Sequence, residues 1–521
     1  MQKKTAGAKR KRHVGAAEPA AAGSAAALRP GLGARSEVIA ACVEYGGRVV
    51  EPEYSKGVSS TMLQSVFGES ISGAKKLGVL VRAALNETKR DVAAAGRETG
   101  IAAETLQRLI DGSEHDGLSI DSLARLLHRT YPVPKRHLMV DEDNSDGGAW
   151  FMTSADSQAT ARVFDRLNAN GATVPYYRYM DTSATSLSPF KPELIEELVG
   201  VEDNEPLNPL VVMNKGHLLG QLTYFIGPVN FYYTVRGVRR CKPMNTGDSC
   251  LITPYVPHSF TSRDLGQYAA IVAVTFSGHV REVLQDLLHL DARALCKYAA
   301  DLRAPASVLS ARISRAAELR GVSGQALHAE LVSKGQDAEV AAAALSGSAC
   351  PAEPRAAATL AAALAEALAV DEGEFNVRPL LEDEEVTFSP PPAGGLGKHA
   401  FAGSAHMADV GGYHWSLVGS SAPEGSRFYQ YVYNCGSVPA TVRWGVEGAA
   451  EEANVRVLAP GDSVTFKPFI QVGYEVPEGG AAATLAIFKC AGCVNRAVMH
   501  EVALFEPKGM TSIASELGMW Y

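Results

Sequence analysis

The 521-residue sequence lacks the features that mark several specialised classes of protein. Its eight cysteines are widely spaced, which does not fit a disulfide framework and makes a reducing, cytoplasmic compartment the expectation. No apolar run reaches about 18 residues, so no membrane span is predicted, and no apolar segment follows the N-terminal charges as in a secretory signal. No P-loop, dinucleotide-binding fingerprint or Gly-x-Ser-x-Gly motif stands in a convincing context. With 46% hydrophobic and 20% charged residues, the chain is predicted to be globular.

The net charge of −8 averages over unlike regions. Residues 1–35 hold eight Lys and Arg against one acid, Glu18, a net charge of +7, so the rest of the chain carries −15. Their Ala-rich composition and basic block indicate a disordered tail, which a linker extends to residue 72. A solvated extension and a targeting segment are both open interpretations of this tail. The acidic main body argues against a protein that binds nucleic acid in bulk.

Two kinds of pattern alternate along the remaining chain. From about residue 73 to 132 apolar residues follow the helical period, and they predict three short helices with a glycine turn at Gly100-Ile101, as in a helix-turn-helix unit. Short β-rich runs then follow at residues 174–180, 221–226, 231–235 and 269–276. Many short strands separated by turns predict a sandwich or a barrel.

The same order then repeats, with a helical pattern over residues 305–370 and strands over 384–521. Gly461-Asp-Ser463 repeats Gly247-Asp-Ser249 at an offset of 214, and Gly321-Val322 repeats Gly100-Ile101 at 221, so we predict an internal duplication. The expected fold class is α+β, a tandem repeat of an all-α helix-turn-helix-like unit followed by a cupin barrel (a double-stranded β-helix). The expected parts are the tail (1–72), helical unit 1 (73–135), a metal-binding catalytic barrel (136–290), helical unit 2 (291–380) and a metal-less structural barrel (381–521).

Two histidines stand out by their context. His217 lies in Asn214-Lys-Gly-His217 at the start of a predicted strand, and His258 ends a Gly-Asp-Ser…Pro-His segment that resembles the second metal-binding motif of cupins. Residues four apart on a strand point to the same side, so Gln221 shares the face of His217. Imidazole ligands suit iron, zinc or nickel.

The identity of the third ligand decides whether such a site contains a carboxylate. Oxygen-activating iron sites commonly combine two His with one carboxylate. Between residues 208 and 262 the only acid is Asp248, and it lies in the Gly-Asp-Ser turn. We therefore expect the amide oxygen of Gln221 to be the third ligand, which leaves the full +2 charge on the metal and favours an anionic chelating substrate.

The same stretch is locally basic, with a net charge of +4. A basic pocket wall would attract phosphate-like or carboxylate groups, although a solvated hairpin is an equal interpretation for three of the cations, Arg239, Arg240 and Lys242. Alignment of the two Gly-Asp-Ser turns places Val472 where His258 stands in the first copy. One barrel is then expected to be catalytic and the other structural.

Taken together, these residues resemble the hydroxyethylphosphonate dioxygenase and methylphosphonate synthase family, from about residue 73 to the C-terminus. The resemblance is greatest at Asn-x-Gly-His (214–217) and at Gly-Asp-Ser…Pro-His (247–258), and Phe505-Glu-Pro also fits. It implies a mononuclear non-haem Fe(II) enzyme that cleaves the carbon–carbon bond of 2-hydroxyethylphosphonate with O₂. Such enzymes use no external reductant and no 2-oxoglutarate.

The metal ligands separate the two branches of this family. The dioxygenase branch has a Glu six residues before the second His, where this chain has Ile252, and the synthase branch has a Gln four residues after the first His, as at Gln221. The resemblance therefore implies Fe(II) held by His217, Gln221 and His258, with methylphosphonate and carbon dioxide or bicarbonate as products. The alternative is the dioxygenase reaction, which gives hydroxymethylphosphonate and formate.

The resemblance also implies the substrate-binding residues. Asn214 and Tyr179 match phosphonate-binding positions, and Lys89 matches a lysine that reaches the active site from a neighbouring subunit, so Lys89 and Tyr179 are expected to be catalytic as well. The family's phosphonate-binding arginine falls near Asn170, and Arg178 is the expected substitute, although strand alternation puts it on the face opposite Tyr179. The implied partners are 2-hydroxyethylphosphonate, O₂ and further copies of the chain in a dimer or tetramer, with no nucleic acid and no membrane.

Two other classes of function remain open. A transcription regulator with a cupin sensor domain would bind duplex DNA through the helical unit, with a salt-dependent affinity. A ligand-binding cupin without catalysis would take up no O₂ with any hydroxyalkylphosphonate.

Overall fold

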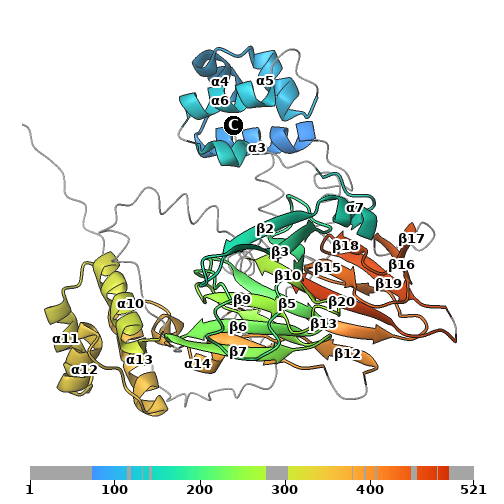
Figure 1. Ribbon diagram of the computed structural model, residues 1–521. Helices are drawn as coiled ribbons and strands as arrows, with labels where there is room; N and C mark the ends of the chain where they lie inside the picture. The colour runs from blue at the N-terminus through green and yellow to red at the C-terminus, as the bar shows by residue number, and fades with distance from the viewer. Residues whose placement is uncertain are drawn as a thin grey trace, which may run out of the picture. The chain divides into compact units, whose positions relative to one another are not determined.

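The computed structural model describes residues 73–113, 119–131, 133–139, 143–276, 303–377, 380–391, 395–404, 407, 409–446, 454–477 and 479–491. Helices and sheets alternate along these residues, so the prediction of a mixed helix and sheet fold is confirmed (Figure 1). The predicted tail over residues 1–72 lies outside the described residues. No helix in the described part of the chain is long and apolar enough to cross a membrane.

The first helical unit has four α-helices among its described residues, where the sequence pattern predicts three. Helix α4 is the unexpected one, because it buries only Ala95 and so has no apolar period. Asp91 caps its start, and Gly100 ends it with a φ of 75°, a left-handed conformation that favours glycine. The elements are α3 (Gly73–Glu87), α4 (Val92–Thr99), α5 (Ala103–Ile110), α6 (Ile120–Thr130) and the 3-10 helix η3 (Lys135–Leu138).

The second helical unit has its own apolar core, which includes Ile313, Leu327, Leu331, Leu360 and Leu364. Gly321, at a φ of 66°, ends its first helix as Gly100 ends α4. The elements are α10 (Pro305–Arg320), α11 (Gly324–Ser333), α12 (Ala338–Ser346), α13 (Pro354–Leu368) and η4 (Glu372–Phe375).

The strands between the two helical units confirm the four predicted β-rich runs. They are β1 (Ala149–Met152), β2 (Arg162–Leu167), β3 (Thr173–Asp181), β4 (Phe190–Glu197), β5 (Gly220–Ile226), β6 (Val229–Val235), β7 (Val238–Met244), β8 (Ser249–Ile252), β9 (His258–Ser262) and β10 (Ala270–Phe276), with the short helix α7 (Ser154–Ala159) after β1.

A second run of strands follows α14 (Glu382–Glu385). It comprises β11 (Val386–Ser389), β12 (Gly397–Ala400), β13 (Val410–Leu417), β14 (Glu424–Gly425), β15 (Tyr429–Asn434), β16 (Ala440–Val446), β17 (Asn454–Leu458), β18 (Ser463–Phe466), β19 (Ile470–Glu475) and β20 (Ala483–Cys490).

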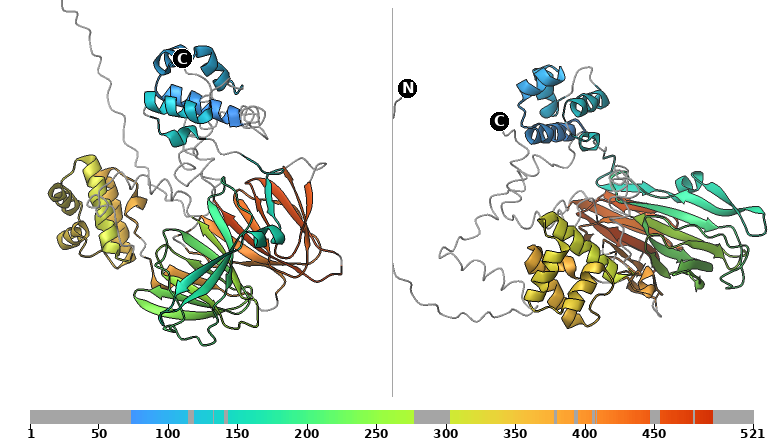
Figure 2. Two further views of the ribbon diagram at one scale, coloured as in Figure 1. Left: turned by 45° about the horizontal axis from the view of Figure 1, so that its top comes forward. Right: turned by 90° about the vertical axis from the view of Figure 1, so that its left-hand side faces the viewer.

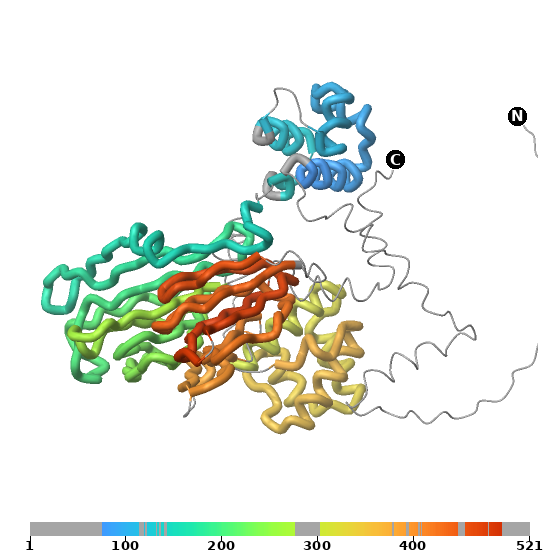
Figure 3. The backbone as a smooth tube through the Cα atoms, turned by 90° about the vertical axis from the view of Figure 1, so that its right-hand side faces the viewer, coloured from blue at the N-terminus to red at the C-terminus, as the bar shows by residue number. Residues whose placement is uncertain are grey.

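These strands form four antiparallel sheets that stack in layers (Figure 2 and Figure 3). The order of the layers is a three-stranded sheet (β7-β6-β9), a seven-stranded sheet (β11-β8-β5-β10-β4-β3-β2), a six-stranded sheet (β1-β18-β15-β20-β13-β12) and a four-stranded sheet (β14-β19-β16-β17). An apolar core fills each of the three gaps. Strands β5, β10 and β15 are buried on both faces because the two large sheets have a core on each side. We call the core between the three-stranded and seven-stranded sheets the inner core.

Each large sheet takes one edge strand from the other run of strands. β1 pairs with β18, Ala149 opposite Phe466, and β11 pairs with β8, Val386 opposite Ile252. Phe466 and Ile252 are 214 residues apart, the same offset as between the two Gly-Asp-Ser turns. The two exchanges therefore have the same register.

Candidate metal centre

His217 and His258 meet at one end of the inner core. Their rings lie edge to face, with centroids 5.2 Å apart. The Tyr255 amide donates to the His217 carbonyl at 2.8 Å, and the Asn214 amide donates to the His258 carbonyl at 3.0 Å, so two backbone bonds join the loop before β5 to β9. Gly216 is required there: its φ is 76°, and a Cβ would lie 2.5 Å from the Tyr255 carbonyl carbon.

Hydrogen bonds determine which nitrogen of each imidazole carries the proton. Nδ1 of His217 lies 2.7 Å from the Leu219 carbonyl oxygen, and Nδ1 of His258 lies 2.8 Å from that of Val256. A carbonyl only accepts, so each Nδ1 is the N–H donor and each Nε2 keeps its lone pair. This is the arrangement by which metal-binding histidines are oriented in proteins.

The Gln221 side chain brings a third lone pair to the same place. Its Oε1 lies 3.3 Å from Nε2 of His217, and its amide nitrogen donates to Thr223 Oγ1 at 2.9 Å. Two atoms without a proton therefore face one another in a site where Gln221 is only 5% exposed. A cation resolves this conflict, because nitrogen and oxygen lone pairs are both ligands for divalent metals.

Asn214 completes the surroundings of His258. Its Oδ1 accepts from the backbone amides of Gly216 at 2.9 Å and His258 at 2.8 Å, so its amide nitrogen, 3.0 Å from His258 Nε2, is the donor in that pair. A metal bound to His258 Nε2 would take this donor's place. Burial lowers the pKa of His258 to about 4, helped by the neighbouring His217 and the Arg166 cation, although the bond to Val256 opposes this shift. The ring is therefore neutral at pH 7, as a metal ligand must be.

Among the residues that the structure describes, no carboxylate is in position to bind the same ion. No group of three His, Cys, Asp or Glu able to hold a metal occurs among the described residues. Asp248 accepts from the Asn245 amide within its own turn, which does not place it at the site. Ile252 is the cross-strand partner of Gln221 and is fully buried in the inner core. The donor set that fits a divalent metal is therefore two imidazoles and one amide oxygen.

Tyr179 faces the inner core, and Arg178 does not. Tyr179 packs against that core beside Phe164 and Tyr177. Burial raises its pKa to about 12 against the opposing Arg166 cation, with smaller upward contributions from Glu197 and Glu193, so the phenol stays a hydrogen-bond donor. Arg178 forms an ion pair with Glu196 at 2.6 Å on the opposite face of the sheet. The expectation that Arg178 lines the site was wrong, because strand alternation points it outward.

Arg166 is the cation that the sequence reasoning missed. Its guanidinium lies 5.3 Å and 5.0 Å from the ring centroids of Tyr176 and Tyr177, and it donates to the Val212 carbonyl at 3.2 Å. Val212 is two residues before Asn214, so Arg166 lies beside the candidate site. Arg166 lies two residues after Phe164 on β2, and the Phe164 ring contacts Tyr179, so strand alternation puts Arg166 on the same face as Phe164. The sequence feature that could have indicated this placement is the Asn168–Gly171 turn after β2. This turn pairs Arg166 with β3, the strand that carries Tyr179.

Four other cations have partners of their own. Arg236 and Arg240 form ion pairs with Glu385 and Glu382 of α14, Arg239 donates to the Val211 carbonyl, and Lys242 lies over the Phe388 ring. These contacts join the β6–β7 hairpin to the segments before β5 and around β11. Glu385 and Glu382 of α14 thus balance the charges of Arg236 and Arg240.

Lys89 follows α3 in the first helical unit, where its ammonium donates to the Asn86 carbonyl at 3.2 Å. Its role at the site stays a prediction.

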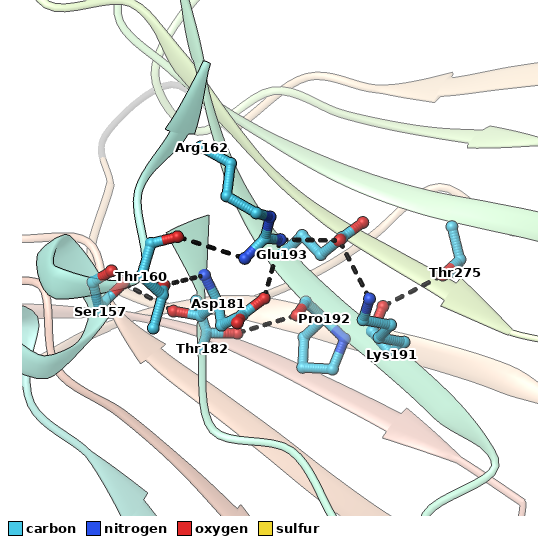
Figure 4. Close-up of polar contacts among 9 residues, drawn as sticks. All are labelled: Ser157, Thr160, Arg162, Asp181, Thr182, Lys191, Pro192, Glu193 and Thr275. Atoms are coloured by element: carbon cyan, nitrogen blue, oxygen red, sulfur yellow. Dashed lines mark hydrogen bonds and ion pairs between the residues drawn. The ribbon is translucent and has the colours of Figure 1, made fainter. Parts of the chain in front are cut away.

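Figure 4 shows a charged network around Lys191 and Glu193. Strand pairing puts it on the same face of the seven-stranded sheet as Gln221. Thr275 of β10 is the cross-strand partner of both Gln221 and Lys191. Lys191 lies 3.3 Å from Glu193, which lies 3.9 Å from Arg162, and Arg162 bonds Asp181 at 2.9 Å. Two cations and two anions therefore balance one another at the open end of this face, where the Lys191 side chain is 64% exposed.

The chain was compared with known proteins. No protein-family model matches it. It is 27% identical over 464 residues to a methylphosphonate synthase of Nitrosopumilus maritimus (strain SCM1), covering 86% of this chain and 95% of that one. Its structure is similar to that of Streptomyces albus 2-hydroxyethylphosphonate dioxygenase with 2-hydroxyethylphosphonate and Fe(II) bound, with a TM-score of 0.71 and 27% identity over 86% of this chain and 99% of that one.

The fold likeness extends to more distant structures. A variant of 2-hydroxyethylphosphonate dioxygenase has a TM-score of 0.62 at 19% identity, over 84% of this chain and 99% of that one. The resemblance drawn from the sequence motifs is confirmed by these similarities.

Proposed function

We propose that this chain is an Fe(II)-dependent oxygenase that cleaves the carbon–carbon bond of 2-hydroxyethylphosphonate with O₂ to give methylphosphonate. The observation that carries the proposal is the donor set: Nε2 of His217 faces the Gln221 amide oxygen, the His258 ring lies beside that of His217, and Ile252 stands opposite Gln221. The similarity to a methylphosphonate synthase and to an Fe(II)-bound 2-hydroxyethylphosphonate dioxygenase supports it. One substrate and one O₂ give one methylphosphonate and one bicarbonate with a proton, so no external reductant enters.

His217, Gln221 and His258 hold the iron in this proposal. Bound Fe(II) supplies oxygen-activating redox chemistry and a Lewis-acidic anchor for the substrate. All three ligands are neutral, so the site keeps a +2 charge and favours a substrate with anionic oxygens. The aromatic side chains of the inner core, among them Phe231, Tyr233 and Phe260, exclude water on one side of the site.

Arg166, Asn214 and Tyr179 bind the phosphonate in this proposal. Arg166 presents a planar, permanently charged donor suited to phosphonate oxygens, and the Val212 carbonyl and two tyrosine rings position it. The Asn214 amide nitrogen is released once a metal takes its place at His258 Nε2. The Tyr179 phenol remains protonated, so it donates rather than repels. Lys89 adds a second cation from a neighbouring subunit of a dimer or tetramer.

We further propose that the chain consists of two copies of a helical unit and a cupin barrel, with domain limits near residues 135, 290 and 380. The equal registers of the two strand exchanges support a duplication. The Phe469 amide donates to the Ser426 carbonyl as Tyr255 donates to that of His217, and Tyr255 and Phe469 share a φ of 65°. Gln430 pairs with Phe466 as Gln221 pairs with Ile252, and Val472 pairs with Trp444 as His258 pairs with Tyr233. The second copy thus has Ser426, Gln430 and Val472 at the ligand positions.

Product analysis tests the proposed function. The full chain is loaded anaerobically with Fe(II) and mixed with 2-hydroxyethylphosphonate and O₂, while an oxygen electrode follows uptake and phosphorus NMR identifies the products. We expect equal consumption of O₂ and substrate, with methylphosphonate as the product. Hydroxymethylphosphonate as the sole product would overturn the synthase assignment, and no O₂ uptake by the iron-loaded protein would overturn the enzyme.

A further inference from the structure

The Gln221 side-chain amide has one oxygen and one nitrogen, and they differ in their ability to bind a metal. Only the amide oxygen can bind Fe(II), since the amide nitrogen has no available lone pair. A turn of the amide by half a revolution exchanges these atoms with almost no change of shape. Some contact must therefore keep Oε1 toward His217, where it lies 3.3 Å from Nε2.

Thr223 provides that contact. It lies two residues after Gln221 on β5, on the same face, and is fully buried. Its Oγ1 accepts a hydrogen bond from the Gln221 amide nitrogen at 2.9 Å. In a site from which water is excluded, a ligating glutamine needs such an acceptor for its NH₂ group, because an unpaired buried donor is strongly unfavourable.

Thr223 stands next to Cys250, its cross-strand partner on β8, and both side chains are fully buried. When Oε1 of Gln221 points toward His217, the Gln221 amide nitrogen points toward Thr223 and donates to its Oγ1. A metal bound to Oε1 therefore leaves the NH₂ group with a buried acceptor, and loss of the Thr223 hydroxyl would leave that donor unpaired.

The second run of strands has lost this acceptor together with the histidines. Gln430 occupies the place of Gln221, but Val432 and Val464 stand where Thr223 and Cys250 form their pair. A glutamine at this position therefore occurs without a threonine where no metal site is expected. Where two histidines are present, the acceptor is present too.

We propose that Thr223 is a positioning residue that selects the oxygen of Gln221 as the metal ligand, an inference that rests on the proposed role of that site. Its effect is on metal affinity before any substrate binds. It acts through Gln221 and touches neither substrate nor metal.

Metal titration of the full-length protein tests this role. Anaerobic binding of Co(II) is followed by its visible spectrum, without substrate, for the wild type, Thr223→Val and Thr223→Ser. We expect Thr223→Val to weaken Co(II) binding by about tenfold to a hundredfold, the usual effect of losing a contact that orients a ligand, and Thr223→Ser to stay within about twofold. Val432→Thr is the matched control in the other run of strands and should bind Co(II) as the wild type does.

A double-mutant cycle separates positioning from packing. A carboxylate at 221 presents oxygen either way round, so Thr223→Val should change Co(II) affinity by no more than about twofold in the Gln221→Glu background. Wild-type affinity in Thr223→Val would overturn the proposal, as would an equal loss in both backgrounds. Failure of the proposed reaction gives a different result. If the protein shows the expected Co(II) pattern but does not consume 2-hydroxyethylphosphonate, the role of Thr223 stands and only the substrate assignment is overturned.

Discussion

Oε1 of Gln221 and Nε2 of His217 lie 3.3 Å apart, and neither atom has a proton to share. Both atoms are held in this arrangement from behind, the imidazole by the Leu219 carbonyl and the amide by Thr223. Two lone pairs held in this way fit the proposed binding of a divalent cation. The absence of a carboxylate from this set distinguishes it from the usual two-histidine, one-carboxylate iron site.

Replacement of Gln221 by alanine should abolish metal-dependent turnover. Loss of one of three protein ligands should weaken Fe(II) binding by at least about a hundredfold, since the remaining pair of histidines cannot hold the ion as tightly. Equilibrium dialysis against Fe(II) and oxygen uptake measure the two effects. Gln430→Ala is the matched control, because Gln430 is 4% exposed and lies at the corresponding position of the second run of strands. Equal effects of the two substitutions would contradict the assignment.

Arg166 should determine affinity for the phosphonate group. Arg166→Met removes a charged planar donor, and we expect KM for 2-hydroxyethylphosphonate to rise at least about tenfold, since charge-assisted bonds to such groups contribute roughly 1.5–3 kcal/mol. Fe(II) affinity should be unchanged. Arg178→Met is the control, because that side chain pairs with Glu196 on the other face of the sheet. A larger effect on KM from Arg178→Met than from Arg166→Met would refute the placement.

The burial of Glu197 should give the protein an unusual dependence of stability on pH. Its carboxyl group is buried with neither oxygen hydrogen-bonded, and burial raises its pKa well above the usual 4.5, a shift that Arg166 opposes. Because the folded-state pKa is raised, the unfolded chain releases this proton first, so Glu197 lowers stability progressively as pH rises above about 4.5. Glu197→Gln should therefore unfold at a higher temperature than the wild type at pH 7–8, and the difference should shrink toward pH 4. Calorimetry across this range measures both unfolding temperatures. A difference between variant and wild type that widens toward low pH would contradict the prediction.

Lys89 should act across a subunit boundary. Lys89→Met keeps the iron ligands, and Gln221→Ala keeps the lysine, so each variant alone should be nearly inactive. Mixed oligomers of the two variants contain sites with both groups intact and should recover a measurable fraction of wild-type oxygen uptake. Co-purification through two different affinity tags provides the mixed species. Mixed oligomers without activity would place Lys89 in its own subunit's site or outside the site altogether.

Several features were predictable because they depend on local pattern. The spacing of four residues pointed to His217 and Gln221 as neighbours, which they are, although His217 lies in the loop before β5 and not on the strand itself. The scarcity of acids around Asp248 pointed to an amide oxygen as the third donor. Repeated Gly-Asp-Ser turns revealed the offset of 214 that reappears in the strand registers. The helix Val92–Thr99 was not predicted, because its single buried residue gives no helical period of apolar residues.

The sequence by itself determined the order of helices and strands, the two histidines with their glutamine, and the class of chemistry they suggest, because residue type and spacing carry that information. Only the tertiary structure decided which cations lie beside the candidate site. Arg236 and Arg240 are neutralised by α14, which is more than 130 residues away in the chain, whereas Arg166 lies beside Val212. Charge alone cannot distinguish these arginines. Their partners come from distant strands and segments, and only the pairing of those segments determines which guanidinium groups are already occupied.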